Sequence, residues 1–248
     1  MERLDKIIAN RGVATRREVK ELVRQGRVLV NGIPAASPEQ KFSMESDVIT
    51  VDGIAVTAER YCYLLLHKPA GVLSATEDSR QPMVLDLLPP EQRRHGLSPV
   101  GRLDKDTEGL LLITNDGDLA HQLLSPKKHV DKVYRARIEG QVTAEDAALF
   151  AKGMEIDDED GAWRAMPAKL NILSSGPESE LEITIREGKF HQIKRMFEAV
   201  DKKVVYLKRL SMGSLRLDET LALGEYRELT EDEVQALKES KGHTNDEE

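Results

Sequence analysis

Apolar residues recur along this chain with two periods, one typical of helices and the other typical of strands. Helical spacing predicts helices at 3–10, 16–25, 118–124, 143–152, 190–200 and after Thr230. Strand-like apolar runs occupy 27–30, 48–51, 63–66, 110–113, 132–138, 168–172, 181–185, 204–207 and 214–217. Helices and strands alternate without a strict βαβ rhythm, and tight-turn sequences are frequent. The pattern therefore predicts an α+β protein with a mixed, mostly antiparallel sheet flanked by helices.

The helix expected at 16–25 has clear boundaries and an amphipathic pattern. Thr15 and Glu18 form a capping-box sequence at its start, and Gly26 supplies the stop. Apolar and basic positions lie on opposite sides: Val19, Leu22 and Val23 against Arg17, Lys20 and Arg24. A basic helix face is often only solvated, so this pattern alone does not establish a binding surface.

Two later elements place polar groups on defined faces. In the strand 132–138, Tyr134 shares a side with Ala136 and Ile138, so we expect its ring to face the interior. The helix 190–200 carries an apolar stripe, which consists of Phe190, Ile193, Phe197 and Val200. Its opposite face consists of His191, Lys194, Arg195 and Glu198.

A charged loop at 100–109 leads into the apolar strand 110–113. Glycines at 101 and 109 allow tight backbone conformations at both ends. Between them the carboxylates alternate with cations: Asp104, Asp106 and Glu108 with Arg102 and Lys105. An aspartate flanked by cations can stay ionised and fixed in place, as a nucleophile requires. The same carboxylates could bind Mg²⁺ in a nuclease, and a solvated, salt-bridged turn is the simplest interpretation of the loop taken alone.

Composition narrows the class of protein. The 248 residues are 40% hydrophobic and 32% charged, which fits a globular protein with a substantial core. The single cysteine, Cys62, excludes an internal disulfide framework and a cysteine-built zinc site. No cofactor-binding loop or metal-ligand set is visible, so no cofactor and no metal are expected. The apolar runs are strand-sized and the N-terminus lacks a secretion signal, so we expect a cytoplasmic protein without a membrane partner.

Charge is unevenly distributed along the chain. The formal net charge is −8, yet residues 1–33 carry eight Arg and Lys against four Asp and Glu. Residues 186–209 carry eight against three. Separate basic patches of this kind can engage phosphates on an otherwise acidic protein, because the field near a surface is local. We expect a small domain at 1–58, a larger one at 59–238, and an acidic, disordered tail at 239–248.

The N-terminal region resembles a known RNA-binding module. The stretches L-D-K-I-I-A-N-R-G and T-R-R-E-V-K-E-L-V-R-Q-G-R-V-L-V-N-G are similar to the S4 domain over about residues 2–57. The resemblance implies an RNA-binding α/β domain whose phosphate contacts are Arg11, Arg16, Arg17, Lys20 and Arg24.

The remainder resembles the pseudouridine synthases, in particular the branch that carries an S4 domain and modifies ribosomal RNA. The matching stretches are K-P-A-G at 68–71, V-G-R-L-D-K-D-T-E-G-L-L-L at 100–112, K-V-Y at 132–134, E-G-K-F-H-Q-I-K-R-M-F at 187–197 and G-E-Y-R-E-L-T at 224–230. The resemblance implies a pseudouridine synthase fold and an isomerase that requires no cofactor. L-F-A-K-G-M at 149–154 and G-E-Y-R-E-L-T at 224–230 look more like the small-subunit enzyme, which would place the target at uridine 516 of 16S ribosomal RNA.

The resemblance also implies residue roles. Asp104 would act as nucleophile or as electrostatic partner of the sugar, and Arg102 and Lys194 would keep it ionised and oriented. Tyr134 would stack on the uracil or take part in proton removal. Further RNA contacts would come from Lys68, His191 and Arg195. The expected partner is ribosomal RNA, free or in an assembly intermediate, and the protein is expected to be a monomer. A large-subunit (23S) enzyme and a non-catalytic RNA-binding or ribosome assembly factor remain as alternatives.

Overall fold

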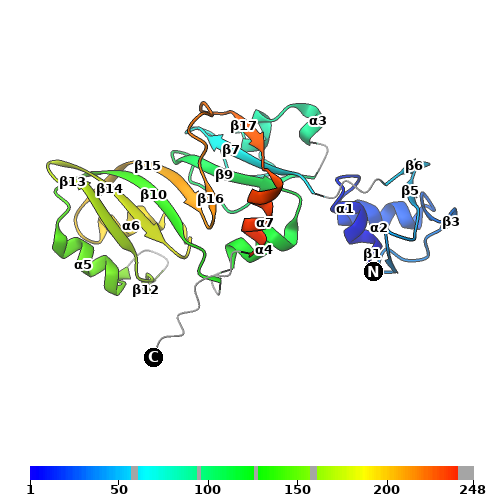
Figure 1. The fold of residues 1–248 in the computed structure, drawn as a ribbon, viewed down its shortest axis with the longest axis horizontal. Coiled ribbons are helices and arrows are strands. Elements are labelled where there is room, and N and C mark those ends of the chain that lie inside the picture. Colours follow the sequence, from blue (N-terminus) through cyan, green and yellow to red (C-terminus); the bar gives the residue numbers. More distant parts are fainter. Residues whose placement is uncertain (57–60, 94–95, 126–127, 157–160, 240–248) are drawn as a thin grey trace.

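The chain forms a small N-terminal unit and a larger, elongated second unit (Figure 1). The computed structural model describes residues 1–56, 61–93, 96–125, 128–156 and 161–239. The acidic tail predicted at 239–248 lies outside the described residues except for Glu239. Residues 155–160 form a second acidic run in the sequence, and 157–160 also lie outside the described residues. Within the described ranges, no helix has the length and apolar character needed to cross a bilayer.

The N-terminal unit packs two helices against a small antiparallel sheet. Its helices are α1 (Leu4–Ala9) and α2 (Arg16–Arg24). The sheet has the order β3 (Ile33–Pro34), β2 (Val28–Val30), β5 (Ile49–Val51) and β6 (Ile54–Ala55), and β1 (Glu2–Arg3) pairs separately with β4 (Lys41–Phe42). The predicted capping box is confirmed, because the Glu18 N–H donates to Thr15 Oγ1 and the Thr15 N–H donates to Glu18 Oε2. Val19 and Val23 are buried as predicted.

One asparagine joins the two units. Asn115 Oδ1 accepts a hydrogen bond from the Cys62 N–H, and Asn115 Nδ2 donates to the Asn10 carbonyl oxygen at 2.8 Å. An ion pair between Lys6 and Asp118 lies nearby. These contacts hold α1 against the start of α4 (Gly117–Leu124).

The second unit is built on one mixed sheet, as the sequence predicted. Its main path consists of β13 (Lys169–Ser174), β14 (Glu178–Ile185), β10 (Lys132–Glu139), β15 (Lys203–Met212), β9 (Glu108–Thr114), β7 (Tyr63–Lys68) and β17 (Tyr226–Glu228). Short strands β8 (Ser98–Pro99) and β16 (Leu215–Arg216) pair with β9 and β15, respectively, and β11 (Glu155–Ile156) pairs with β12 (Trp163–Arg164). Along the main path, neighbouring strands are antiparallel except for β15 and β9, which are parallel.

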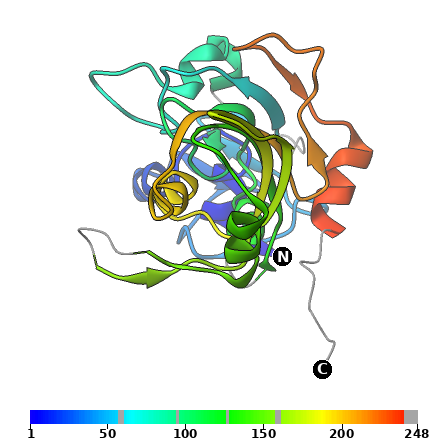
Figure 2. The ribbon, with the colours of Figure 1, turned by 90° about the vertical axis from the view of Figure 1, so that its left-hand side faces the viewer.

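Two hydrophobic cores cover the sheet. In β9, Leu111 and Ile113 enter one core while Leu110 and Leu112 enter the other, so this strand is buried on both faces. The larger core includes α5 (Ala144–Lys152) and α6 (Gln192–Glu198), whose rings Phe150 and Phe197 are 4.9 Å apart. Figure 2 shows α6 along the concave side of the curved sheet. The other core includes α4 and α7 (Glu231–Glu239), and η1 (Val84–Leu87) and α3 (Pro90–Arg93) complete the fold.

The parallel contact between β9 and β15 depends on a glycine. Gly109 has φ +102°, and a Cβ placed there would lie 2.3 Å from the Arg209 carbonyl oxygen. Only a residue without a side chain lets the two backbones approach this closely. Because the charged loop 100–107 precedes β9, this approach brings that loop beside β15 and β10.

One expectation about α6 is wrong. The apolar stripe was predicted to begin at Phe190, but the helix begins at Gln192 and Phe190 is 66% exposed. The reason is a left-handed turn at His191, with φ 52° and ψ 27°, which takes Phe190 out of the helical register. Ile193 and Phe197 are buried as predicted.

Candidate active site

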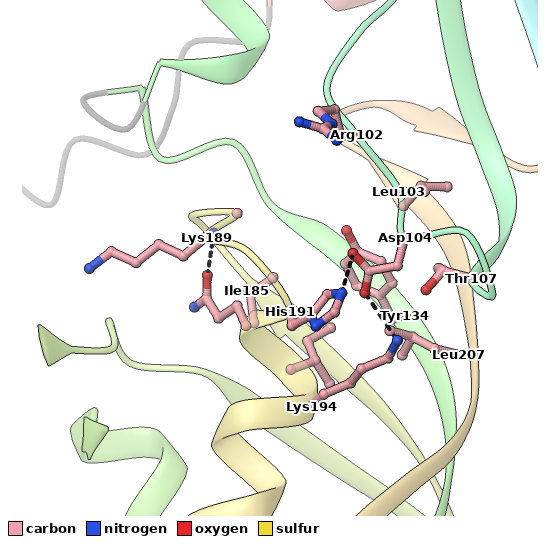
Figure 3. Close-up of a pocket in the computed structure, with 13 residues that line it drawn as sticks. Arg102, Leu103, Asp104, Thr107, Tyr134, Ile185, Lys189, His191, Lys194 and Leu207 are labelled. Atoms are coloured by element: carbon pink, nitrogen blue, oxygen red, sulfur yellow. Dashed lines mark hydrogen bonds and ion pairs between the residues drawn. The ribbon is translucent and has the colours of Figure 1, made fainter. Parts of the chain in front are cut away.

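A pocket opens between the charged loop and the N-terminal end of α6. Asp104 and Thr107 line it from the loop, Tyr134 from β10, and His191 and Lys194 from the α6 side (Figure 3). The side chain of Asp104 is 22% exposed, so the carboxylate is sheltered but accessible. All four residues that the resemblance made catalytic therefore line this pocket, because Arg102 also lies on its edge.

Two cationic or potentially cationic groups face the Asp104 carboxylate. Lys194 Nζ lies 3.3 Å from Oδ2, and His191 Nε2 lies 3.8 Å from Oδ1. Lys194 also donates to both oxygens of Asp106, at 2.7 and 2.9 Å. Lys194 thus ties the loop to α6 and places a positive charge beside Asp104.

The two acids keep the Lys194 ammonium charged. Burial lowers the pKa of Lys194, but the hydrogen bond with Asp106 and the charges of Asp104 and Asp106 outweigh burial and leave this pKa above its usual value. For Asp106, burial raises the pKa, and the hydrogen bond and charge of Lys194 more than reverse that effect. A fixed ion pair of this kind orients both side chains.

Tyr134 forms part of the pocket floor. It is 7% exposed and belongs to the larger core, which confirms the prediction that it faces the interior. Figure 3 shows its ring behind the Asp104 carboxylate. A flat ring in this position can contact one face of a planar base that enters the pocket.

Arg102 does not pair with Asp104. The residue is exposed at the pocket rim, and Figure 3 shows its side chain directed away from the carboxylate. Among the described residues, the ion pairs of Asp104 are those with Lys194 and His191. The expectation that Arg102 orients Asp104 is therefore corrected. His191, and not Arg102, is the second group that faces the Asp104 carboxylate beside Lys194.

Lys68 does not reach the surface. It is 0% exposed, and its ammonium donates to the backbone carbonyl oxygens of Pro69, Asp104, Lys105 and Thr107 at 2.8 to 3.3 Å. The predicted RNA contact of Lys68 is incompatible with this burial and is corrected. Burial lowers the pKa of Lys68 to about 8, while the nearby charges of Asp106, Asp104 and Glu108 act in the opposite direction. The residue fixes the backbone of the loop that presents Asp104.

Two positioning residues were not identified from the sequence. Ser74 Oγ donates to the Leu103 carbonyl oxygen and accepts from the Leu103 N–H, which anchors the residue before Asp104. Gln192, only 3% exposed, accepts from the Lys189 N–H and donates to Glu187 Oε1. Gln192 stands in the E-G-K-F-H-Q-I-K stretch, and its position in that stretch was the available sequence signal.

The basic residues of the N-terminal unit differ in their surroundings. Arg16, Arg17 and Lys20 are exposed on α2. Arg24 is also exposed but forms an ion pair with Glu21 at 2.7 Å. Arg11 is half-buried and donates to the Ile7 carbonyl oxygen. The α2 surface thus presents Arg17 and Lys20 more freely than Arg24.

The three loop carboxylates do not converge on one point. Asp106 binds Lys194, whereas Glu108 accepts a hydrogen bond from the Tyr206 hydroxyl at 2.9 Å. In the described part of the chain, no group of three or more His, Cys, Asp or Glu side chains is arranged to hold a metal ion. This arrangement favours an ion-paired carboxylate over a Mg²⁺ site.

Comparison with known families assigns the second unit. A model described as RNA pseudouridylate synthase matches residues 62–199, more than half of the chain. The chain belongs to this family. A second model, the S4 domain, matches residues 2–49. The protein is therefore an RNA pseudouridine synthase with an S4 domain before its catalytic part.

Individual relatives cover nearly the whole chain. An uncharacterized RNA pseudouridine synthase of Bacillus subtilis is 50% identical over 96% of this chain and 98% of its own. The ribosomal large subunit pseudouridine synthase B of Bacillus subtilis is 40% identical over 98% of each chain. The ribosomal small subunit pseudouridine synthase A of Vibrio cholerae is also 40% identical, over 95% of this chain and 99% of its own.

A solved structure supports the same fold. A crystal structure of a pseudouridylate synthase is 36% identical, with a TM-score of 0.67, and the match covers 96% of this chain and 100% of that chain. The predicted α+β architecture, with an S4 domain followed by a pseudouridine synthase fold, is thereby confirmed.

Proposed function

We propose that this pseudouridine synthase acts on ribosomal RNA and that Asp104 is its catalytic residue. The observation that carries the proposal is the placement of Asp104, held between Lys194 and His191 over the ring of Tyr134. A carboxylate kept in place by a lysine ammonium, with an aromatic floor beside it, suits a planar base attached to an electron-deficient sugar carbon.

The reaction needs one carboxylate and a proton path. The N1–C1′ bond of uridine breaks, the uracil turns, and C5 bonds to C1′. C5 then loses its proton and N1 gains one, so that atoms and electrons balance without an external reagent. Asp104 acts as nucleophile or as electrostatic partner of C1′ in this scheme. Tyr134 stacks on the uracil or takes part in removal of the C5 proton.

The target uridine has to leave its base stack to enter the pocket. Extrusion costs a few kcal/mol, and the cost is lower for a base in a loop or a single strand. Arg102 stands exposed at the rim, where a guanidinium can occupy the space that the extruded base leaves. His191 lines the pocket, and Arg195 lies against the Phe190 ring beside it, which supports contacts of both residues with the same RNA.

The N-terminal unit supplies affinity at a distance from the chemistry. We assign residues 1–58 to the S4 domain and 59–238 to the catalytic domain, with 239–248 as a tail. Arg16, Arg17, Lys20 and Arg24 lie exposed on α2, and Arg11 lies at the end of α1, so that cations are concentrated where phosphates can approach. We also expect the enzyme to act as a cytoplasmic monomer.

We propose uridine 516 of 16S ribosomal RNA as the target. The support is L-F-A-K-G-M at 149–154, together with the 40% identity to a small-subunit enzyme over nearly the full length. A large-subunit target is the second candidate, because the identity to a large-subunit enzyme is also 40%.

One experiment separates the two targets. Purified protein is incubated with 16S and 23S transcripts and, in parallel, with assembly intermediates of each subunit, and pseudouridine is mapped by mass spectrometry. Pseudouridine in 16S RNA alone supports the small-subunit proposal, whereas pseudouridine in 23S RNA alone overturns it. RNA that stays bound but unmodified in every sample contradicts the catalytic proposal and favours an assembly factor.

A further inference from the structure

Phe190 lies beside the active-site pocket with most of its ring open to solvent. It is 66% exposed, whereas every other Phe, Tyr and Trp in the described ranges is buried or half-buried. A single exposed apolar side chain is common on protein surfaces and proves nothing alone. Phe190 differs because three further features of the structure converge on its ring.

The first feature is the backbone next to it. His191 adopts a left-handed conformation, with φ 52° and ψ 27°, which residues with a side chain rarely adopt. In this conformation the two rings stack, with centroids 3.8 Å apart and planes inclined by 20°. Unusual backbone geometry is concentrated at functional sites, and here it maintains an exposed aromatic pair.

The second feature is the position of the stack relative to the chemistry. His191 Nε2 faces Asp104 Oδ1 at 3.8 Å, so the same imidazole meets the Asp104 carboxylate with its edge and the Phe190 ring with its face. Phe190 is therefore one ring further out from Asp104 than His191. A base at Asp104 would place the next nucleotide of its strand near that outer ring.

The third feature is a cation from the next turn of α6. The guanidinium carbon of Arg195 lies 5.3 Å from the centroid of the Phe190 ring. An aromatic ring with an adjacent guanidinium is the combination that binds unpaired nucleotides, since the ring stacks on the base and the cation attracts the phosphate. The ring has no hydrogen-bonding group, so it accepts any of the four bases.

We infer that Phe190, supported by His191 and Arg195, is a stacking platform for an unpaired RNA base next to the target uridine. The inference rests on the proposed role of Asp104, because extrusion of one uridine into the pocket takes away a stacking partner of its neighbour. The platform restores that contact outside the pocket and sets the position of the strand.

A binding titration tests the platform directly. The probe is fluorescently labelled hexauridylate, measured by anisotropy against the full-length wild type, Phe190→Leu and Phe190→Tyr. Removal of one stacked base weakens binding about tenfold, so we expect that change for Phe190→Leu and affinity within about twofold of wild type for Phe190→Tyr. Leu173→Ala, at an exposed apolar position outside the pocket lining, is the control and should match the wild type.

A second probe separates stacking from general effects on folding or charge. With six abasic ribose phosphates in place of hexauridylate, the wild type and Phe190→Leu should bind equally. Equal affinity of the two proteins for hexauridylate would overturn the platform, and so would an equal weakening in Phe190→Leu and Phe190→Tyr.

Kinetics on a ribosomal RNA transcript distinguish this inference from the proposed function. Phe190→Leu should raise KM about tenfold and leave kcat within about twofold, because the ring positions RNA without touching the reacting atoms. A decrease of kcat at unchanged KM would contradict the platform. If the wild type modifies no transcript, the proposed function fails, and the hexauridylate titration alone decides the role of Phe190.

Discussion

The Lys68 ammonium donates a hydrogen bond to the Thr107 carbonyl oxygen at 2.8 Å, in a place fully shielded from water. Thr107 closes the loop that carries Asp104, and the same ammonium also donates to the Asp104 and Lys105 carbonyl oxygens. The end of β7 therefore fixes the backbone of the loop that carries the Asp104 carboxylate.

Removing this ammonium should destabilise the protein. Lys68→Met leaves buried carbonyl oxygens without a donor, and we expect a decrease of about 3–5 kcal/mol in the free energy of unfolding, measured by urea denaturation. Lys105→Met is the matched control, because Lys105 is exposed in the same loop and its ammonium donates to the side chain of Gln81. A Lys68→Met variant as stable as the control would contradict the role assigned to Lys68.

The close approach of β9 and β15 makes a second prediction. Gly109→Ala combines a positive φ with a Cβ 2.3 Å from the Arg209 carbonyl oxygen, so we expect a decrease of about 3–5 kcal/mol in the free energy of unfolding. Gly117→Ala is the control, since a Cβ there meets nothing within 4 Å. Similar thermal denaturation of the two variants would show that the close approach tolerates a methyl group.

Lys132 should make stability depend on pH. Burial, and next the charge of Arg209, lower its pKa from 10.5 to about 8, against the opposing charges of Asp131 and Glu187. Between these two values the unfolded chain holds a proton that the folded protein has released, so the free energy of unfolding rises with pH. The free energy of unfolding of the wild type, minus that of Lys132→Met, should therefore increase from about pH 8 to pH 10.5 in urea titrations. A constant difference would contradict the lowered pKa.

The exposed cations of α2 should control RNA affinity. Arg17→Ala combined with Lys20→Ala should weaken binding to ribosomal RNA and flatten the logarithmic salt dependence by about 0.7–0.9 for each phosphate that is no longer neutralised. Arg24→Ala should have a smaller effect, because Arg24 is already paired with Glu21. Filter binding between low and moderate salt measures both slopes. An unchanged slope in the double variant would mean that this face is only solvated.

Local signals in the sequence predicted much of the fold. The helix boundaries at α2 and α5 followed from capping residues, and the period-two pattern placed Tyr134 on the interior face of β10. These features depend on neighbours within a few positions, which a single sequence displays directly.

The corrected residues depend on contacts between distant segments. Lys68 is buried because β7 lies between β9 and β17 in the sheet, and its carbonyl partners are up to 39 positions away. His191, and not Arg102, is the second neighbour of Asp104 because the left-handed turn before α6 directs the imidazole into the pocket. Phe190 leaves the predicted stripe at the same turn, for which helical periodicity gives no signal.

The most direct test of the account is the pseudouridine yield of Asp104→Asn on a ribosomal RNA transcript that the wild type modifies, determined by mass spectrometry beside a binding titration. The substitution keeps the shape of the side chain and removes its charge. We predict RNA affinity within about twofold of wild type and no detectable pseudouridine. Pseudouridine formed by Asp104→Asn at a rate near that of the wild type would contradict the central claim.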